Sequence, residues 1–404
     1  MKLSLAAPRK FVFVLGCLTT LAAMTIDMSL PAIPDMVRSM ATRISAGQMI
    51  VGAFMLGAAL GQLPAGLLSD RFGRRPVLIC GLVVFTIMSA VCTFAQSIEI
   101  MLTARFVQGL SSAVGTVVTR AIVRDITSGA AAARLMSVLV MIFTAAPMLA
   151  PVLGGYLVTL WGWRAPFAAI SALGFVLLVS TIAVIHETHK ADASERILRQ
   201  FTSSVRQFFA QRQSILGALL VMLPSAGFLS MITGSPALVI EIYGYPAQQF
   251  GLLFALIGVA ILAGSTLNRS LLHRYSGIQV IGLAASTLGL AGVQLLLIAW
   301  LEDVPLFWIW GNFCLYMFGV GMVLPNAAAL ALDPLPQTAG VSSSIVGVLQ
   351  TLSAALGSLA SGFIFDGSVG RIVIILGIFG SATFAAYALR HLVLRGTAII
   401  QAPS

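Results

Sequence analysis

Long runs of apolar residues recur along the whole chain, separated by short polar segments. A membrane-spanning helix needs about 20 such residues. The runs show no alternation of polar and apolar positions, and in hydrocarbon every backbone amide must be paired, so the pattern predicts helices. Twelve spans are expected, with approximate limits 11–33, 47–68, 77–95, 99–121, 135–157, 164–185, 214–240, 246–267, 278–300, 305–331, 338–364 and 371–394.

The longest polar segment, 186–213, lies near the midpoint and separates two sets of six spans. A weak repeat supports a duplication: the Asp-Arg-Phe run at 70–72 is echoed by His-Arg-Tyr at 273–275, 203 residues later. Parallel halves with a binding site between them are a transporter arrangement. We therefore expect an all-α membrane protein in which residues 1–185 and 214–404 form two pseudo-symmetric six-helix bundles joined by a cytoplasmic linker.

Basic residues gather on one side of this predicted topology. The termini, the linker and the loops on their side hold eighteen Lys and Arg, whereas the opposite loops hold four, Arg38, Arg43, Arg164 and Arg371. Because basic loops stay in the cytoplasm, we expect both termini there, in a multi-pass membrane protein. The N-terminus resembles a signal peptide, but its apolar run continues through Asp27, so an uncleaved first span is expected.

Composition excludes several classes of protein. Hydrophobic residues make up 59% of the 404 and charged residues only 9%, against about 25% charged in soluble domains. The net charge of +10 follows one membrane face, so no nucleic-acid partner is expected. No lysine completes a phosphate-binding Gly-x-x-x-x-Gly-Lys-Ser/Thr motif. Unless a separate subunit hydrolyses ATP, transport is therefore expected to run on an ion gradient, without a cofactor.

A metal site is not expected either. The four cysteines are scattered through apolar runs and form no metal-binding pair. The His-Glu-Thr-His run at 186–189 has histidines three apart, whereas a zinc-peptidase helix needs them four apart. We interpret this run as solvated surface, and the protein as a transporter and not an enzyme.

Two charges lie inside predicted spans, Asp27 in the first and Arg105 in the fourth. Each costs at least about 2.5 kcal/mol in the bilayer, which marks both as functional candidates. Both lie six residues from the outer end of their span, roughly 9 Å deep at 1.5 Å per residue. We predict that Asp27 takes up and releases a proton and that Arg105 tunes this exchange. The alternatives are a fixed ion pair, or an Arg105 that bonds only backbone carbonyls.

The segment 66–76 reads Gly-Leu-Leu-Ser-Asp-Arg-Phe-Gly-Arg-Arg-Pro. It resembles the signature of the major facilitator superfamily, Gly-x-Leu-x-Asp-Arg-x-Gly-Arg-Arg, which follows the second helix. The resemblance implies that this loop holds the outward-facing state through contacts at the cytoplasmic bundle interface. That gating role is assigned to Gly66, Asp70, Arg71, Gly73, Arg74 and Arg75. Asp125 is a candidate partner for the arginines, with a solvated acid beside Arg124 as the alternative.

Further motifs narrow the resemblance. The run 105–109, Arg-Phe-Val-Gln-Gly, is similar to the family's proton-coupling motif Arg-x-x-Gln-Gly. Residues 150–155 resemble the antiporter motif Gly-Pro-x-x-Gly-Gly through Pro151, Gly154 and Gly155, with alanine at the first position. The segment 27–34 resembles the Asp-x-Tyr-Leu-Pro opening of drug/proton antiporters, with Ser29 in place of the tyrosine. Together with 233–236, 324–327 and 162–164, these motifs resemble the Bcr/CflA branch of multidrug exporters.

The resemblance implies alternating access around a cavity lined by spans 1, 4, 7 and 10. Candidate cavity residues are Met24, Met28, Gln108, Phe228, Met231, Asn312 and Tyr316, with lipid contact or bundle packing as the alternative for the methionines and aromatics. The expected function is proton-coupled efflux of structurally varied, amphipathic drugs by a monomer in the lipid bilayer. The alternative is an exporter of one endogenous metabolite, such as a siderophore or a sugar.

Overall fold

The computed structural model describes residues 9–127, 129–188 and 196–394, and their regular structure is helical throughout. Twelve helical segments of these residues are long and apolar enough to cross a membrane. The predicted all-α, multi-pass architecture is therefore confirmed.

The first half of the chain supplies six of the membrane-crossing segments. Its elements are α1 (Arg9–Ser29), η1 (Leu30–Ala32), α2 (Ile33–Ser39), α3 (Ile44–Phe72), α4 (Arg74–Phe94), α5 (Ile98–Ile126), α6 (Gly129–Trp161) and α7 (Arg164–Val184). The amphipathic α8 (Arg196–Ala210) follows. The second half consists of α9 (Arg212–Pro236), η2 (Ala237–Ile242), α10 (Ala247–Leu271), α11 (Gly277–Ile298), α12 (Leu306–Leu332), η3 (Pro336–Thr338), α13 (Ala339–Ile364), α14 (Val369–Ala388) and α15 (Arg390–Leu394).

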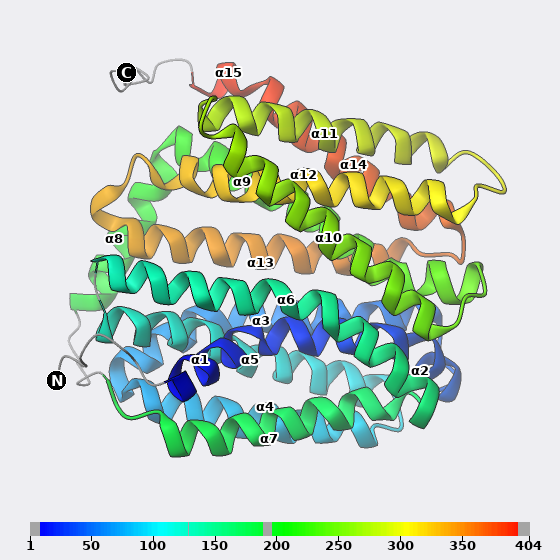
Figure 1. Ribbon diagram of the computed structural model, residues 1–404, viewed down its shortest axis with the longest axis horizontal. Helices are drawn as coiled ribbons and strands as arrows, with labels where there is room; N and C mark the ends of the chain where they lie inside the picture. The colour runs from blue at the N-terminus through cyan, green and yellow to red at the C-terminus, as the bar shows by residue number, and fades with distance from the viewer. Residues whose placement is uncertain (1–8, 128, 189–195, 395–404) are drawn as a thin grey trace.

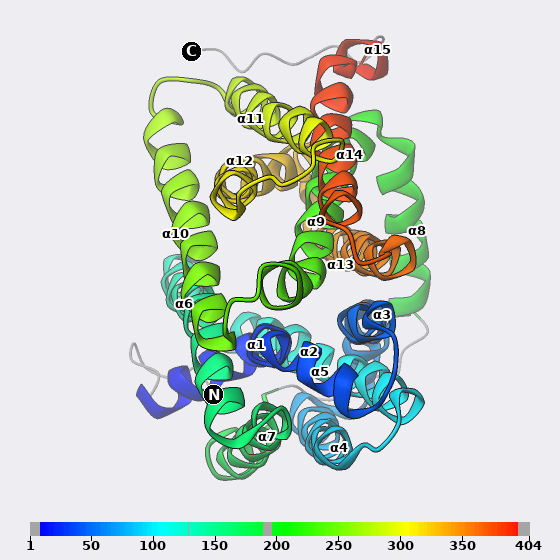
Figure 2. The same cartoon turned by 90° about the vertical axis from the view of Figure 1, so that its right-hand side faces the viewer.

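The two sets of helices lie side by side, α1 to α7 below and α9 to α15 above in Figure 1. The described chain begins and ends at one end of the bundle, on the left in Figure 1, where α8 also lies; we call this the terminal end. The opposite end, which carries α2 and η2, is the distal end. Figure 2 views the molecule from the distal end.

The first span is longer than predicted, running over 10–39 as α1, η1 and α2 in succession. Pro31 and Pro34 stand in the first turns of η1 and α2, where a missing backbone N–H breaks no helical bond. The seventh span ends in η2, a π-helix in which the N–H of Tyr243 donates to the carbonyl of Leu238, five residues back. Such wide turns are rare and concentrate at functional sites.

The linker contains a helix where the sequence predicts a polar loop. In α8, Ser204 and Phe208 are buried while Arg206 and Phe209 are exposed, so one face packs and the other does not. The buried face lies against α13 and α9. Both views show α8 running across the terminal end, at a steep angle to the spanning helices (Figures 1 and 2).

Glycines allow the closest approaches within each half. A Cβ at Gly57 or Gly61 of α3 would contact the backbone of α5, at the carbonyls of Phe106 and Leu110. Small residues spaced four apart allow such close helix packing in membranes. In the second half, Gly264 of α10 meets the carbonyl of Phe318 in α12 in the same way.

The halves touch along two helix pairs, α3 with α13 and α6 with α10. Gln62 of α3 donates to the hydroxyl of Thr351 in α13 over 2.8 Å. Toward the distal end α10 lies close to α6, and toward the terminal end it rises away from it (Figure 1). The two halves are therefore closer together at the distal end along this pair.

Candidate functional site

The centre of the first half holds a buried guanidinium. Arg105 of α5 is 1% exposed, and its Nη1 donates to Oε1 of Gln108, one turn further on, over 3.0 Å. Its Nη2 donates to the hydroxyl of Ser29, at the last residue of α1. The side chain thus joins two helices through neutral acceptors.

A second step extends this chain of hydrogen bonds to α4. Nε2 of Gln108 donates to the hydroxyl of Ser89 over 2.7 Å, and that hydroxyl donates to the carbonyl of Phe85 over 2.7 Å. Because the amide oxygen of Gln108 accepts from Arg105 and its nitrogen donates to Ser89, the orientation of the amide is defined at both ends.

Aromatic rings support the charge of Arg105. The guanidinium carbon lies 4.9 Å from the ring centroid of Phe167 in α7 and 5.7 Å from that of Phe54 in α3. Cation–π contacts of this kind are worth about 2 kcal/mol when desolvated. The Nε of Arg105 is buried without a partner, so one donor of the fork is unused.

Asp27 of α1 is 5% exposed, and among the described residues no donor lies within hydrogen-bond distance of its carboxylate. Within the described residues, no ion pair joins Asp27 to Arg105. The structure thus brings the two predicted residues to neighbouring positions, through Ser29, without pairing them. Neither alternative interpretation, a fixed ion pair or bonds to carbonyls only, describes this arrangement.

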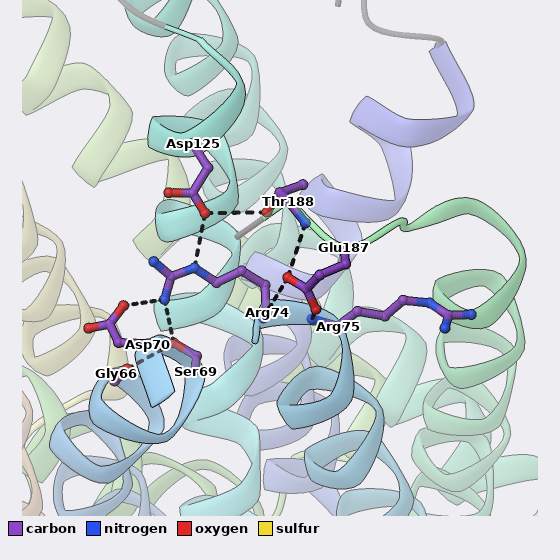
Figure 3. A network of polar contacts seen from close by, with 8 residues as sticks. All are labelled: Gly66, Ser69, Asp70, Arg74, Arg75, Asp125, Glu187 and Thr188. Atoms are coloured by element: carbon purple, nitrogen blue, oxygen red, sulfur yellow. Dashed lines mark hydrogen bonds and ion pairs between the residues drawn. The ribbon is translucent and has the colours of Figure 1, made fainter. Parts of the chain in front are cut away.

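The predicted gating motif forms a dense polar network (Figure 3). Nη1 of Arg74 lies 2.5 Å from Asp70 and 2.8 Å from the hydroxyl of Ser69, and its Nε lies 3.0 Å from Asp125. The carbonyl of Gly66 accepts from Ser69 over 2.9 Å. The arginine side chain is 6% exposed, so these charge-assisted bonds compensate a nearly complete loss of hydration.

Glu187 closes the network from 113 residues away in sequence. Its two carboxylate oxygens accept from the backbone N–H groups of Arg74 and Arg75, over 2.9 and 3.1 Å. These are the first two N–H groups of α4, which have no partner within the helix. A Cβ at Gly73, whose φ is +97°, would lie 2.6 Å from Glu187, so only glycine fits at this turn.

The neighbouring arginine makes the reciprocal contact. Nε and Nη2 of Arg75 donate to the carbonyls of Ile185 and Ile182, over 2.9 and 3.0 Å, at the C-terminal end of α7. A carboxylate therefore caps the start of α4 and a cation caps the end of α7, as the two helix dipoles favour. Arg71 lies apart from this cluster, with its guanidinium over the ring of Phe72.

His186 and Glu187 are exposed, as the interpretation of 186–189 as solvated surface predicts, but Glu187 and Thr188 also make contacts that it did not predict. The hydroxyl of Thr188 donates to Asp125 over 3.3 Å. Sequence gave no signal for these contacts, because a short polar run after a span looks the same whether or not it folds back. His189 lies outside the described residues.

The predicted antiporter motif lies where α6 meets both halves. A Cβ at Gly154 would contact the carbonyl of Met28 in α1, and one at Gly155 would contact the carbonyl of Ala247 in α10. From the other side, a Cβ at Gly251 of α10 would lie 2.7 Å from the carbonyl of Pro151. Consecutive glycines thus bring α6 against different halves of the molecule.

The predicted cavity residues are spread over both halves. Met24 and Phe228 are half-buried, and Met28 is buried in the core of the first half. Met231 and Tyr316 have no exposed surface, and the hydroxyl of Tyr316 donates to the carbonyl of Pro224 over 3.2 Å. In this conformation, therefore, Met231 and Tyr316 line no open space. Buried Asn312 donates to the carbonyl of Trp308, and its Oδ1 has no partner.

One ion pair in the described part of the chain joins the two halves. Nη1 of Arg38, in α2, lies 3.7 Å from Glu241 in the π-helix η2, and Nη2 of Arg38 lies 2.5 Å from Asp35. The pair is at the distal end, where Arg38 is exposed and Glu241 is 22% exposed. In the sequence, Arg38 is only one of four basic residues in the less basic loops and Glu241 only follows the predicted seventh span, so neither residue signals this pair.

The chain resembles known transporters over most of its length. An uncharacterized MFS-type transporter of Bacillus subtilis (strain 168), YdgK, is 31% identical over 387 residues, covering 92% of this chain and 94% of the relative. A bicyclomycin resistance protein homolog of Haemophilus influenzae is 30% identical over 361 residues, covering 88% and 90%. Multidrug resistance protein D of Escherichia coli (strain K12) is 28% identical over 364 residues, covering 89% and 91%.

Solved structures share the fold. A bacterial homolog of the human lysosomal transporter Spinster superposes with a TM-score of 0.77 at 15% identity, covering 98% of this chain and all of that one. A D-xylose–proton symporter gives a TM-score of 0.73 at 15% identity, covering 93% and 97%. The family model described as Major Facilitator Superfamily matches residues 15–358. The chain is a membrane transporter that belongs to the major facilitator superfamily.

Proposed function

We propose that the chain exports structurally varied small molecules, antibiotics included, in exchange for protons. The observation that carries the proposal is Asp27, a carboxylate buried in a membrane-spanning helix with no donor from the described residues and with Arg105 bonded nearby. A carboxylate without a counter-ion favours its neutral, proton-bound form, and approach of a cation favours release. Asp27 can therefore couple proton exchange to a movement of the surrounding helices.

Relatives support the class of substrate. Similar proteins include a bicyclomycin resistance protein homolog and multidrug resistance protein D. Met24 and Phe228, both half-buried, provide adaptable apolar surface on α1 and α9. Gln108 and Asn312 supply the polar groups of the proposed cavity lining. Met28, Met231 and Tyr316, which are buried in this conformation, join the lining once the halves move. Export of one metabolite, such as a siderophore or a sugar, remains the second candidate because of Ser29 at the expected tyrosine.

The proposed orientation places the terminal end in the cytoplasm of a bacterial inner membrane, following the basic loops. With the distal end outside, the close approach of α6 and α10 there supports an inward-facing conformation. All partners of Arg74 that the structure gives belong to residues 69–187, in the first half and the start of the linker, which fits a cytoplasmic gate that is not engaged with the second half.

The two duplicated halves are proposed to move relative to each other during transport. Bundles 1–185 and 214–404 rock about their interface, and the linker 186–213 joins them. A single chain contains both halves, so we propose a monomer as the working unit. The proton gradient supplies the energy, without a cofactor.

The test uses everted membrane vesicles, in which an imposed pH gradient is followed while antibiotics and lipophilic cations are added. We expect several unrelated compounds to dissipate the gradient in the wild type, and Asp27→Asn to abolish the response. Asp366→Asn is the matched control, since Asp366 lies in an exposed loop with its own partner, Arg371. Full exchange by Asp27→Asn would refute Asp27 as the proton carrier. A wild type that responds to no compound would favour the single-metabolite exporter.

A further inference from the structure

Arg105 donates a hydrogen bond to the hydroxyl of Ser29 and not to the carboxylate of Asp27. On α1 two acceptors lie two residues apart, Asp27 and Ser29, and Nη2 of Arg105 donates to Ser29. Residues at i and i+2 of a helix point to different sides, so a guanidinium bonded to Ser29 is held off the side of the helix that presents Asp27. In water the attraction would favour the carboxylate, which means that the surrounding structure imposes the choice.

The rest of the cluster fixes the guanidinium in this position. Gln108 accepts from Nη1 and is itself anchored to Ser89 on α4. The ring of Phe167 lies against the guanidinium. Ser29 also donates to the carbonyl of Ile26 over 2.8 Å, which orients its oxygen to accept from Arg105. Arg105 is thus held by neutral partners on three helices.

Asp27 meets few other charges. The helices that pack against α1 are α5, α6 and α7. Besides Arg105, the charged and titratable residues of these helices within the described segments are Glu99, Arg120, Arg124, Asp125, Arg134, Tyr156 and Arg164. Of these cations, Arg105 is the one that the described structure bonds to α1, two residues from Asp27. Its approach to Asp27 would favour release of the proton from the carboxylate.

We propose that Ser29 is a positioning residue that holds Arg105 away from Asp27 and so sets the pH at which the transporter exchanges its proton. The inference rests on the proposed function. When Ser29 holds Arg105, Asp27 has no counter-ion and binds a proton readily. When helix movement breaks the Ser29 bond, the unused donors of Arg105 become available to Asp27 and the proton leaves.

The decisive variant is Ser29→Ala, measured as the pH profile of gradient-driven transport in proteoliposomes. Without the hydroxyl, Arg105 loses its partner on α1 and pairs with Asp27, which favours the charged carboxylate. We expect the profile to move toward acid by about one pH unit, the effect of an arginine next to an aspartate. Ser29→Thr, which keeps a hydroxyl, is expected to restore the wild-type profile.

Ser111→Ala is the matched control. Ser111 is also a buried serine, it lies on α5 less than two turns from Arg105, and it bonds only the carbonyl of Gln108 in its own helix. We expect its pH profile to match the wild type. If Ser29→Ala fails to insert into the membrane, the pH profile of Ser89→Ala is measured instead. This variant removes the hydroxyl that anchors Gln108, and it is expected to shift the profile toward acid by a smaller amount.

The outcomes are distinct. An acid shift in Ser29→Ala or Ser89→Ala, absent in Ser111→Ala and in Ser29→Thr, supports the inference. A wild-type protein that couples to protons while Ser29→Ala, or Ser89→Ala in its place, keeps an unchanged profile overturns it. A wild type without proton coupling instead overturns the proposed function itself.

Discussion

At the scale of single residues, burial decides which charges matter. Asp27 and Arg105 were predictable from sequence, because a charge inside an apolar run is costly and therefore conspicuous. Ser29 was noticed only as a departure from a family pattern, since a serine in a helix usually bonds its own backbone. The structure shows that it does both, donating to Ile26 and accepting from Arg105. To predict a contact of this kind between two helices, one must know how the helices pack as well as their sequence.

Arg105→Lys tests whether charge alone is sufficient. Lysine keeps the charge but offers a compact ammonium that cannot reach Ser29 and Gln108 in a fork or stack on Phe167. Losing one hydrogen bond to a charged group costs about 1.5 kcal/mol, or roughly tenfold, so we expect at least that fall in proton-driven transport. The rate per inserted molecule in vesicles measures it. Wild-type rates in Arg105→Lys would show that the fork has no role.

At the scale of elements, hydrophobic pattern predicted the spans but not what caps them. The twelve spans follow from length and apolar content. The helix α8 was not predicted, although apolar residues such as Val205 and Phe208 recur in it at helical spacing, because the segment is too polar to be a membrane span. The pairing of Arg74 with Asp125 was expected, whereas the capping of α4 by Glu187 was not. A cap supplied from a distant segment leaves no local signature, unlike the Ser or Asp that usually precedes a helix.

Glu187→Ala is expected to loosen the start of α4. The variant leaves the N–H groups of Arg74 and Arg75 without their carboxylate, and loss of a helix cap costs about 1 kcal/mol. We expect a lower thermal unfolding temperature of the purified protein in detergent, with Glu187→Gln intermediate because its amide offers one acceptor oxygen. The exposed His186→Ala is the control. Equal unfolding temperatures for all three variants would exclude a capping role.

At the scale of the whole molecule, the two-bundle plan was predictable and the contacts between bundles were not. Relative placement depends on backbone approach at Gly155 and Gly251 and on the distal ion pair between Arg38 and Glu241. Gly155 belongs to the antiporter motif, but the motif does not say which helix it meets, and Gly251, Arg38 and Glu241 belong to no motif. The division into halves was predictable from the spacing of the spans and from the basic loops. Which end of the molecule is closed could be judged only from the three-dimensional arrangement.

The distal ion pair makes a measurable prediction. Exposed pairs contribute about 0.2–1 kcal/mol, so Arg38→Gln and Glu241→Gln are each expected to raise the open fraction of the distal end up to several-fold. Maleimide labelling of a cysteine introduced near η2 reports that fraction. The double variant should resemble Glu241→Gln, because the coupling is already lost. Additive effects of the two substitutions would show that the residues do not interact.

The glycines of α6 carry one more consequence. At Gly155 and Gly251 the two halves meet backbone to backbone, with no side chains interlocked between them. Where two helices meet through backbone alone, they can shift against each other without a change of rotamer. Two turns further along α10, the side chain of Met148 packs against Gly258 and has to rearrange when the helices move. We therefore expect the rocking motion to be resisted at Met148 and at the ion pairs and hydrogen bonds near the ends, and not at Gly155 and Gly251.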